Sequence, residues 1–172
     1  MNQKAKQFLA AGIGMAALIG LDQWTKYLAV EKLMGKEACV IWPGVFELRY
    51  LENRGAAFGM LQGKQGFFFL IGIIVLAAAV YFFYRLPYRK RYLPLALCVG
   101  GIAAGAIGNM IDRLSQGYVV DFFYFCLIDF PIFNVADCYV TVGAFALAVL
   151  VMFYYQDEDF SVFSFKKGGD RE

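Results

Sequence analysis

QGFFFLIGIIVLAAAVYFFY, residues 65–84, runs for 20 positions without a charged side chain. An α-helix of this length is about 30 Å long, which matches the hydrocarbon thickness of a bilayer. Phe, Ile, Leu and Val dominate the stretch, and these residues favour insertion of a helix into lipid. The stretch therefore predicts a transmembrane helix, and the rest of the chain is interpreted around it.

Three other runs have the same character. Residues 92–111 are uncharged over 20 positions and residues 138–156 over 19. Residues 7–21 are uncharged, and their apolar pattern continues past Asp22 and Lys26. We expect this first span to stay uncleaved, because no small-residue cleavage pattern follows its apolar run. The predicted fold is an all-α membrane protein with four transmembrane helices, at about residues 7–29, 66–85, 92–112 and 136–155.

The composition agrees with a polytopic membrane protein. Hydrophobic residues make up 60% of the 172-residue chain and charged residues 17%, against about 45–50% and about 25% in soluble domains. These values exclude a disordered chain, a nucleic-acid-binding domain and most soluble enzymes. The chain has no His, which excludes His-based catalytic triads and His-ligated zinc. Its four Cys form no C-x-x-C pair, so we expect no metal and no cofactor.

The basic residues predict the orientation in the membrane. They gather before the first span, in the short hinge at residues 85–91 and after the fourth span. Short cytoplasmic segments carry such an excess of Lys and Arg. Both termini are therefore expected inside, with residues 30–65 and 113–135 outside. We expect one membrane domain over residues 1–156 and a polar cytoplasmic tail over residues 157–172.

The first outer loop has strand character. CVIW at residues 39–42 precedes Pro43 and Gly44, and the alternating run VFELRYL follows. β-Branched and alternating residues around a Pro-Gly turn are typical of paired strands. We therefore expect residues 30–65 to be partly β and to form a small extracytoplasmic sheet region on the membrane.

Polar residues within or beside the spans all fall on the outer side. Ionisable groups in a membrane are costly and commonly functional. Asp22 and Lys26 are four residues apart and share a helix face. The inner halves of the spans carry no ionisable group, so the pattern indicates a one-sided site and not a path through the membrane. The other members are Asn53, Arg54, Asn109, Asp112, Arg113, Asp121, Asn134 and Asp137.

Each cluster also has a structural interpretation. Asp22 and Lys26 could form an ion pair that only stabilises the helix end, and Asn134 could simply cap a helix. Asp121, in YVVDFF, lies between bulky apolar residues in a short outer segment, where a charge without a partner would be out of place. Gly101 and Gly105, followed by Gly108, favour close helix packing over a ligand role.

Asp121 and Asp137 are the best candidates for chemistry. Two carboxyls brought together near an apolar boundary share one proton, as in aspartic proteases. The ionised Asp activates a water, and the protonated Asp polarises a peptide carbonyl and then protonates the leaving nitrogen. The residue types permit this mechanism, and the sequence alone does not place the two carboxyls side by side.

Four motifs in chain order resemble a known family. They are Asp22-Gln23-Trp24-Thr25-Lys26; Asn53-Arg54-Gly55-Ala56-Ala57-Phe58; Gly108-Asn109-Met110-Ile111-Asp112-Arg113 with Gly117 and Val120-Asp121-Phe122; and Phe133-Asn134-Val135-Ala136-Asp137. The set and its order are similar to those of lipoprotein signal peptidase, or signal peptidase II. The resemblance covers about residues 8–155.

The resemblance implies a bacterial membrane aspartyl endopeptidase that cuts the signal peptide from prolipoproteins just before a diacylglyceryl-modified Cys. It implies that Asp121 and Asp137 are the catalytic pair. It assigns substrate-binding or supporting roles to Asp22, Lys26, Asn53, Gly55, Asn109, Asp112, Arg113, Asn134 and Ala136. The expected location is the bacterial cytoplasmic membrane with an extracytoplasmic site, and the expected inhibitor is the cyclic peptide globomycin.

Two other functions stay open at this point. A small ion-coupled transporter would need polar groups near the midplane and a route to both faces. A non-catalytic scaffold could bind a partner helix through the glycine-rich third span, but it leaves the aspartates unexplained. The expected partners are a prolipoprotein and membrane lipid, with no nucleic acid, and we expect a monomer.

Overall fold

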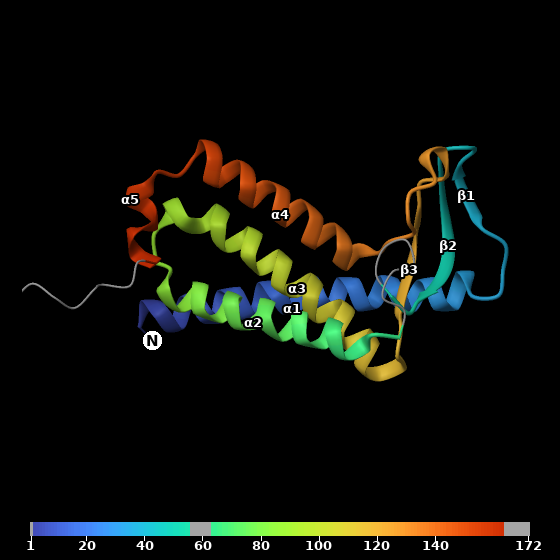
Figure 1. Ribbon diagram of the computed structural model, residues 1–172, viewed down its shortest axis with the longest axis horizontal. Helices are drawn as coiled ribbons and strands as arrows, with labels where there is room; N and C mark the ends of the chain where they lie inside the picture. The colour runs from blue at the N-terminus through green and yellow to red at the C-terminus, as the bar shows by residue number, and fades with distance from the viewer. Residues whose placement is uncertain (1, 56–62, 164–172) are drawn as a thin grey trace, which may run out of the picture.

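Four long helices run side by side and form the body of the structure, a computed structural model that describes residues 2–55 and 63–163 (Figure 1). They are α1 (Gln3–Leu33), α2 (Gln65–Arg85), α3 (Leu93–Gln116) and α4 (Val135–Phe153). All four are long and apolar enough to cross a membrane. The predicted fold class of four transmembrane helices with a small sheet is therefore confirmed.

Helix α3 lies at the centre of the bundle and contacts the other three helices. Its glycines let α4 approach closely. A Cβ added at Gly105 would lie 2.5 Å from the carbonyl oxygen of Ala136 and 2.8 Å from Val140 Cγ2. Helix α4 contributes Gly143, where a Cβ would lie 3.0 Å from Ile102 Cγ1. Small residues at these points bring the two backbones together, as is common between helices in lipid.

Replacing Gly105 with Ala should destabilise the protein by about 1–3 kcal/mol, because the added methyl group overlaps the backbone of α4. Gly101→Ala on the same helix is the matched control, since its Cβ would meet nothing nearer than the Tyr139 carbonyl oxygen at 3.8 Å. Thermal unfolding in detergent should separate the two variants. Equal melting temperatures would show that α4 moves aside at no cost.

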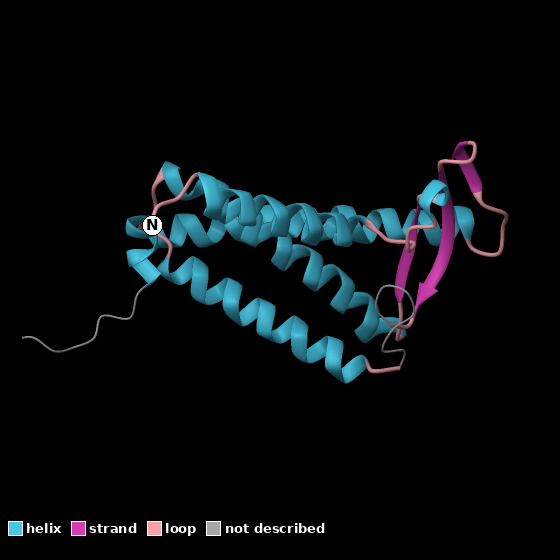
Figure 2. Ribbon diagram, turned by 45° about the horizontal axis from the view of Figure 1, so that its top comes forward, coloured by secondary structure: helices cyan, strands magenta, loops and turns pink. Residues whose placement is uncertain are grey.

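A three-stranded antiparallel sheet closes one end of the bundle and runs across the helix direction (Figure 2). Its order is β1 (Cys39–Trp42), β2 (Phe46–Asn53) and β3 (Val119–Tyr124). The sheet expected from the first outer loop is present. The third strand was not predicted, and Asp121, expected in a loop, lies within it. Residues 119–122 are all buried, so β3 lacks the alternation that reveals a half-exposed strand.

Helix α1 is longer than the predicted 7–29 and supports the sheet. Its 31 residues correspond to about 46 Å, against about 30 Å of hydrocarbon. The last turns therefore extend beyond the bilayer core. There Ala29 and Leu33 pack against Val120 and Phe122 of β3. The result is a rigid connection between a membrane helix and the strand that carries Asp121.

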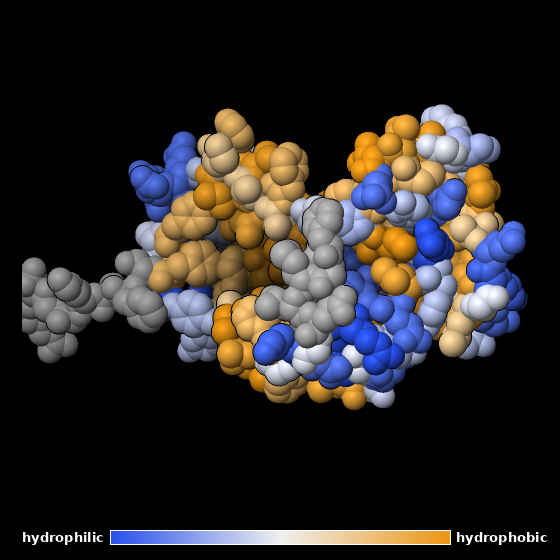
Figure 3. Space-filling view, turned by 45° about the vertical axis from the view of Figure 1, so that its right-hand side comes forward, coloured by the Kyte–Doolittle hydropathy of each residue, from blue (hydrophilic) through white to orange (hydrophobic). Residues whose placement is uncertain are grey.

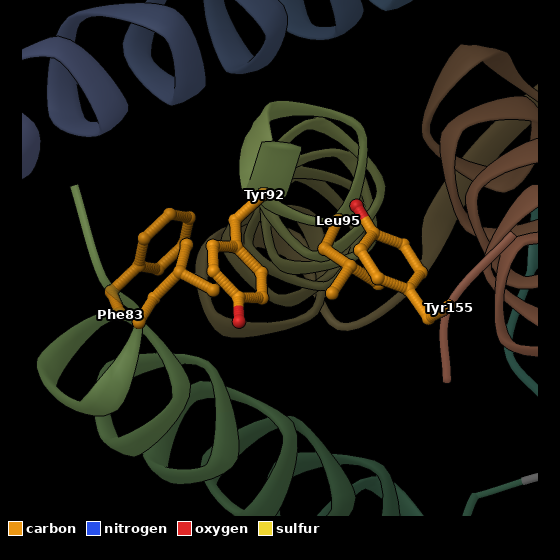
Figure 4. Close-up of a cluster of buried hydrophobic side chains, with 5 residues drawn as sticks. Phe83, Tyr92, Leu95 and Tyr155 are labelled. Atoms are coloured by element: carbon orange, nitrogen blue, oxygen red, sulfur yellow. The ribbon is translucent and has the colours of Figure 1, made fainter. Parts of the chain in front are cut away.

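The opposite end of the bundle is closed by the C-terminal segment. It contains α5 (Asp157–Phe160) and η4 (Ser161–Phe163), which the sequence analysis placed in a polar tail. Arg91 donates to both carboxylate oxygens of Asp159, and Phe163 stacks on Phe82 at 5.3 Å. Figure 4 shows the buried cluster at this end, formed by Phe83, Leu86, Tyr92, Leu95 and Tyr155. Helices α2, α3 and α4 are thereby joined.

Candidate active site

A buried lysine is the first element of the site. Lys26 of α1 has 3% of its surface exposed. Its Nζ lies 2.9 Å from Asp22 Oδ2, 3.0 Å from Asp112 Oδ2 and 2.9 Å from Asn109 Oδ1. An ammonium group has three donors, so each has an acceptor. The ion pairs join α1 to α3 and stabilise a buried charge.

Asp22 extends the connection to α4. Its second oxygen accepts a hydrogen bond from the backbone N–H of Ala136 at 2.9 Å. Ala136 and Asp22 are both fully buried. A Cβ added at Gly108 would lie 2.5 Å from Asp22 Oδ2, so only glycine leaves room for this carboxylate. Asp22 therefore fixes the first turn of α4, in which Asp137 lies.

The start of α4 is a capping box. Asn134 accepts from the Asp137 N–H at 3.0 Å, and Asp137 Oδ2 accepts from the Asn134 N–H at 3.3 Å. The other oxygen of Asp137 accepts from Asn109 Nδ2 at 2.8 Å. These donors and the helix N-terminus all stabilise a negative charge on Asp137. They also hold its side chain in one orientation.

Asp121 lies beside this cap and is 1% exposed. Asn134 Nδ2 donates to its Oδ1 at 2.6 Å, and Asn53 Nδ2 donates to its Oδ2 at 2.8 Å. Asn134 thus contacts both aspartates, Asp121 through its amide nitrogen and Asp137 through its amide oxygen. Burial, followed by the nearby charge of Asp137, raises the pKa of Asp121 to about 7. The two carboxyls therefore belong to one titrating site.

Arg113 connects α3 to the segment that follows β2. Its guanidinium donates to the carbonyl oxygen of Gly55 at 3.1 Å and lies 4.5 Å from the centre of the Phe68 ring. The same residue lines a cavity of about 260 Å³ between α2 and α3. The cavity is mostly apolar, and its other lining residues include Phe68, Phe69, Ala106, Met110 and Leu114.

The structure brings all eleven predicted site residues into one region at the sheet end of the bundle. Nine of them form the network of direct contacts around Lys26, Asn109 and Asn134. The other two are Arg113 and Gly55, since Arg113 donates to the carbonyl oxygens of Asn109 and Gly55. Ala56, Ala57 and Phe58, quoted in the second motif, lie outside the described residues. Sequence reasoning missed Gln23, whose amide donates to Asp112 at 2.8 Å and to Asp22 at 3.2 Å. The signal available in the sequence was the polar amide side chain of Gln23 within a predicted membrane span.

Arg113 and Asn53 both make hydrogen bonds within the site. Asn53 donates to Asp121, and its oxygen accepts from the Gly55 N–H at 3.0 Å. Arg113 donates to Asn109 and Gly55. In this state both side chains position other parts of the site.

The chain is similar to known proteins over most of its length. The model of the family described as Signal peptidase (SPase) II matches residues 14–153. A lipoprotein signal peptidase of Streptococcus thermophilus is 43% identical over 143 residues, which cover 83% of this chain and 92% of that protein. One of Streptococcus pyogenes is 39% identical over 148 residues, covering 86% and 94%.

Solved structures agree with the sequence relatives. One, described as a bacterial membrane enzyme, superimposes with a TM-score of 0.71 at 32% identity and covers 95% of this chain and 94% of its own. A second with the same description gives 0.72 at 33% identity, covering 85% and 94%. The matched region contains both aspartates and the buried Lys26. This chain belongs to the signal peptidase II family.

Proposed function

We propose that this protein is an aspartic endopeptidase that removes the signal peptide from diacylglyceryl-modified prolipoproteins. Asp121 and Asp137 are the catalytic pair. The observation that carries the proposal is Asn134, whose side chain donates to the Asp121 carboxylate and accepts from the backbone N–H of Asp137, within the family's matched region. The family relatives are named lipoprotein signal peptidase, and peptide-bond hydrolysis by two carboxyls needs no His.

The surroundings favour different roles for the two aspartates. Asp137 receives hydrogen bonds from Asn109 and from a backbone N–H at a helix N-terminus, which stabilise its ionised form. It takes a proton from water, and the water oxygen attacks the scissile carbonyl carbon. Asp121, with its raised pKa, holds the shared proton, donates a hydrogen bond to the carbonyl oxygen and then protonates the leaving nitrogen.

Activity should decline as the pH rises above about 7. Asp121 keeps its proton below its pKa of about 7 and loses it above, and the doubly ionised pair has no acid to offer. The plot of kcat/KM against pH should therefore fall about tenfold per pH unit on its alkaline side. A profile that stays flat to about pH 9 would assign the proton to another group.

Asn53→Ala tests this assignment. The substitution removes a donor that stabilises the Asp121 carboxylate. The pKa of Asp121 then rises, and the alkaline limb should move upward by about half a unit to one unit. Asn2→Ala is the control, since it removes an asparagine hydrogen bond at the opposite end of the bundle.

The expected substrate fits the position of the site. Basic side chains gather at the end of the bundle opposite the sheet, at Lys4, Lys6, Arg85, Arg89, Lys90 and Arg91. The positive-inside rule makes that end cytoplasmic, so the carboxyl pair faces the extracytoplasmic interface of the bacterial cytoplasmic membrane. A lipid-bearing cleavage point lies at this depth. The apolar cavity beside Arg113 suits an aliphatic part of the substrate.

The direct test is cleavage of a purified prolipoprotein with and without its diacylglyceryl group. The protein should cut only the lipidated form, directly before the modified Cys, as a monomer, and globomycin should inhibit it. Well-folded protein that cuts neither form would refute the proposal. Ion flux into proteoliposomes would then support a transporter, although the buried charged side chains of the described residues all lie at one end of the bundle.

A further inference from the structure

One loop of the sheet end exposes large apolar side chains. This apolar loop, residues 125–130, connects β3 to the segment before α4 and contains η3 (Cys126–Ile128). Leu127 is 67% exposed and Ile128 69%, and Phe130 is 46% exposed. Three such side chains on one short loop are more than scattered surface residues explain.

The base of the apolar loop is held close to the start of α4. Its base is closed by backbone hydrogen bonds between Phe123 and Phe133, and α4 begins only two residues later. The Leu127 N–H also bonds to Val45 in the turn between β1 and β2. In Figure 1 the loop lies on the bundle side of β2, at the end of the sheet toward α4.

The apolar loop carries little charge that would favour contact with water. From Phe125 to Phe133 the sequence FCLIDFPIF has one charged residue, Asp129. Its carboxylate accepts a hydrogen bond from the Tyr124 hydroxyl at 2.7 Å. Asp129 also adopts a left-handed conformation with φ 49, which Asp tolerates better than most residues. This turn presents the apolar side chains on either side of it.

Helix α4 also exposes large apolar side chains. Val142 is 66% exposed and Phe145 73%, as expected of a membrane-facing helix. Figure 3 shows hydrophobic surface at the upper end of the sheet lobe, across a notch from the hydrophobic helices. The two apolar surfaces therefore lie on either side of this notch.

We propose that the apolar loop inserts into the extracytoplasmic interface of the bilayer on the α4 side. Leu127, Ile128 and Phe130 anchor the sheet there, as the apolar face of a monotopic segment does. Because β3 leads directly into the loop, the anchor also sets the depth of Asp121. The occupant of this surface is lipid, and the anchor holds the site level with a membrane-bound cleavage point.

Fluorescence quenching tests the insertion without any need for activity. The chain has two Trp, Trp24 and Trp42, so Ile128→Trp in a chain with both replaced by Phe gives a single probe on the loop. In phosphatidylcholine vesicles, lipids brominated near the carbonyl end of the acyl chain should quench this probe. The reference is the Trp42→Phe chain, in which the exposed Trp24 reports from a membrane helix. Quenching by aqueous iodide but not by brominated lipid would overturn the proposal.

A cleavage assay tests the role in setting depth, and this arm rests on the proposed function. Leu127→Glu with Ile128→Glu should lower cleavage in vesicles by roughly tenfold, the scale of removing large apolar side chains from lipid. Cleavage in detergent should be unchanged, since a micelle imposes no fixed depth. Leu127→Met with Ile128→Met is the control and should behave as wild type in both media.

The outcomes separate the two proposals. Equal losses in vesicles and detergent would mean that the loop only supports the fold, and no loss in either would mean that it sets no depth. If wild-type protein cuts nothing while brominated lipid quenches the Ile128→Trp probe, the peptidase is refuted and the membrane anchor stands.

Discussion

Asp121→Asn and Asp137→Asn should each lower cleavage of a lipidated prolipoprotein by at least about a thousandfold, because each removes one half of the proposed acid–base pair. Asn has nearly the volume of Asp, so packing around β3 and the start of α4 is preserved. It has only one acceptor oxygen, however. Both oxygens of Asp121 accept hydrogen bonds, from Asn53 and Asn134, so one donor then faces an NH₂ group.

That mismatch should lower the stability of Asp121→Asn by about 1–3 kcal/mol, so unfolding must be measured beside activity. Asp129→Asn is the matched control, since this exposed carboxylate lies outside the site and contacts Tyr124. It should cut as wild type does. A folded Asp121→Asn or Asp137→Asn protein with near-normal activity would remove that residue from the catalytic pair.

Lys26→Met should produce the largest loss of stability of any single substitution discussed, about 3–5 kcal/mol. Met has a similar length and fills the space, but it leaves Asp22 and Asp112 as buried carboxylates without their cation. Asn109 loses a donor as well. Thermal unfolding in detergent measures the effect. Activity should fall with stability, because Asp22 holds the N–H of Ala136 beside Asp137.

Two variants make this result specific. Lys32→Met lies on the same helix, where Lys32 pairs with Glu31 on the exposed surface, and it should change stability by less than about 0.5 kcal/mol. Adding Asp112→Asn to Lys26→Met should recover part of the loss, because one unpaired charge disappears. Equal melting of Lys26→Met and wild type would mean that the pair is not buried in the folded protein.

Sequence reasoning succeeded where one local rule decides the outcome. Residues 65–84 have no charge to keep them out of lipid, and α2 occupies 65–85. Asp22 and Lys26 share a helix face because of their spacing, and they form an ion pair at 2.9 Å. The motif order of the resembling family supplied the site residues, which no local rule would have grouped.

It failed where long-range packing decides. Strand β3 packs on α1 through Val120 and Phe122 and pairs along its edge with β2. Residues 119–122 are all buried, so its sequence shows no alternation. Residues 157–163 begin with three acidic residues in succession and read as a solvated tail. Their partners, Arg91 and Phe82, lie on other helices. The role of the Gln23 amide is visible only when α3 packs beside α1, because its partner Asp112 lies on α3.

The pairing of β2 with β3 has a consequence for how the protein is made. Asn53 and Asp121 are 68 positions apart in the chain, and two membrane helices are synthesised between them. Asp137 follows later still, on α4, the last of the four candidate spans among the described residues. A nascent chain halted during insertion therefore holds its carboxyls apart. With Asp121 and Asp137 as the proposed catalytic pair, we expect proteolytic competence only once α4 is in place, so a chain halted before α4 should not cut.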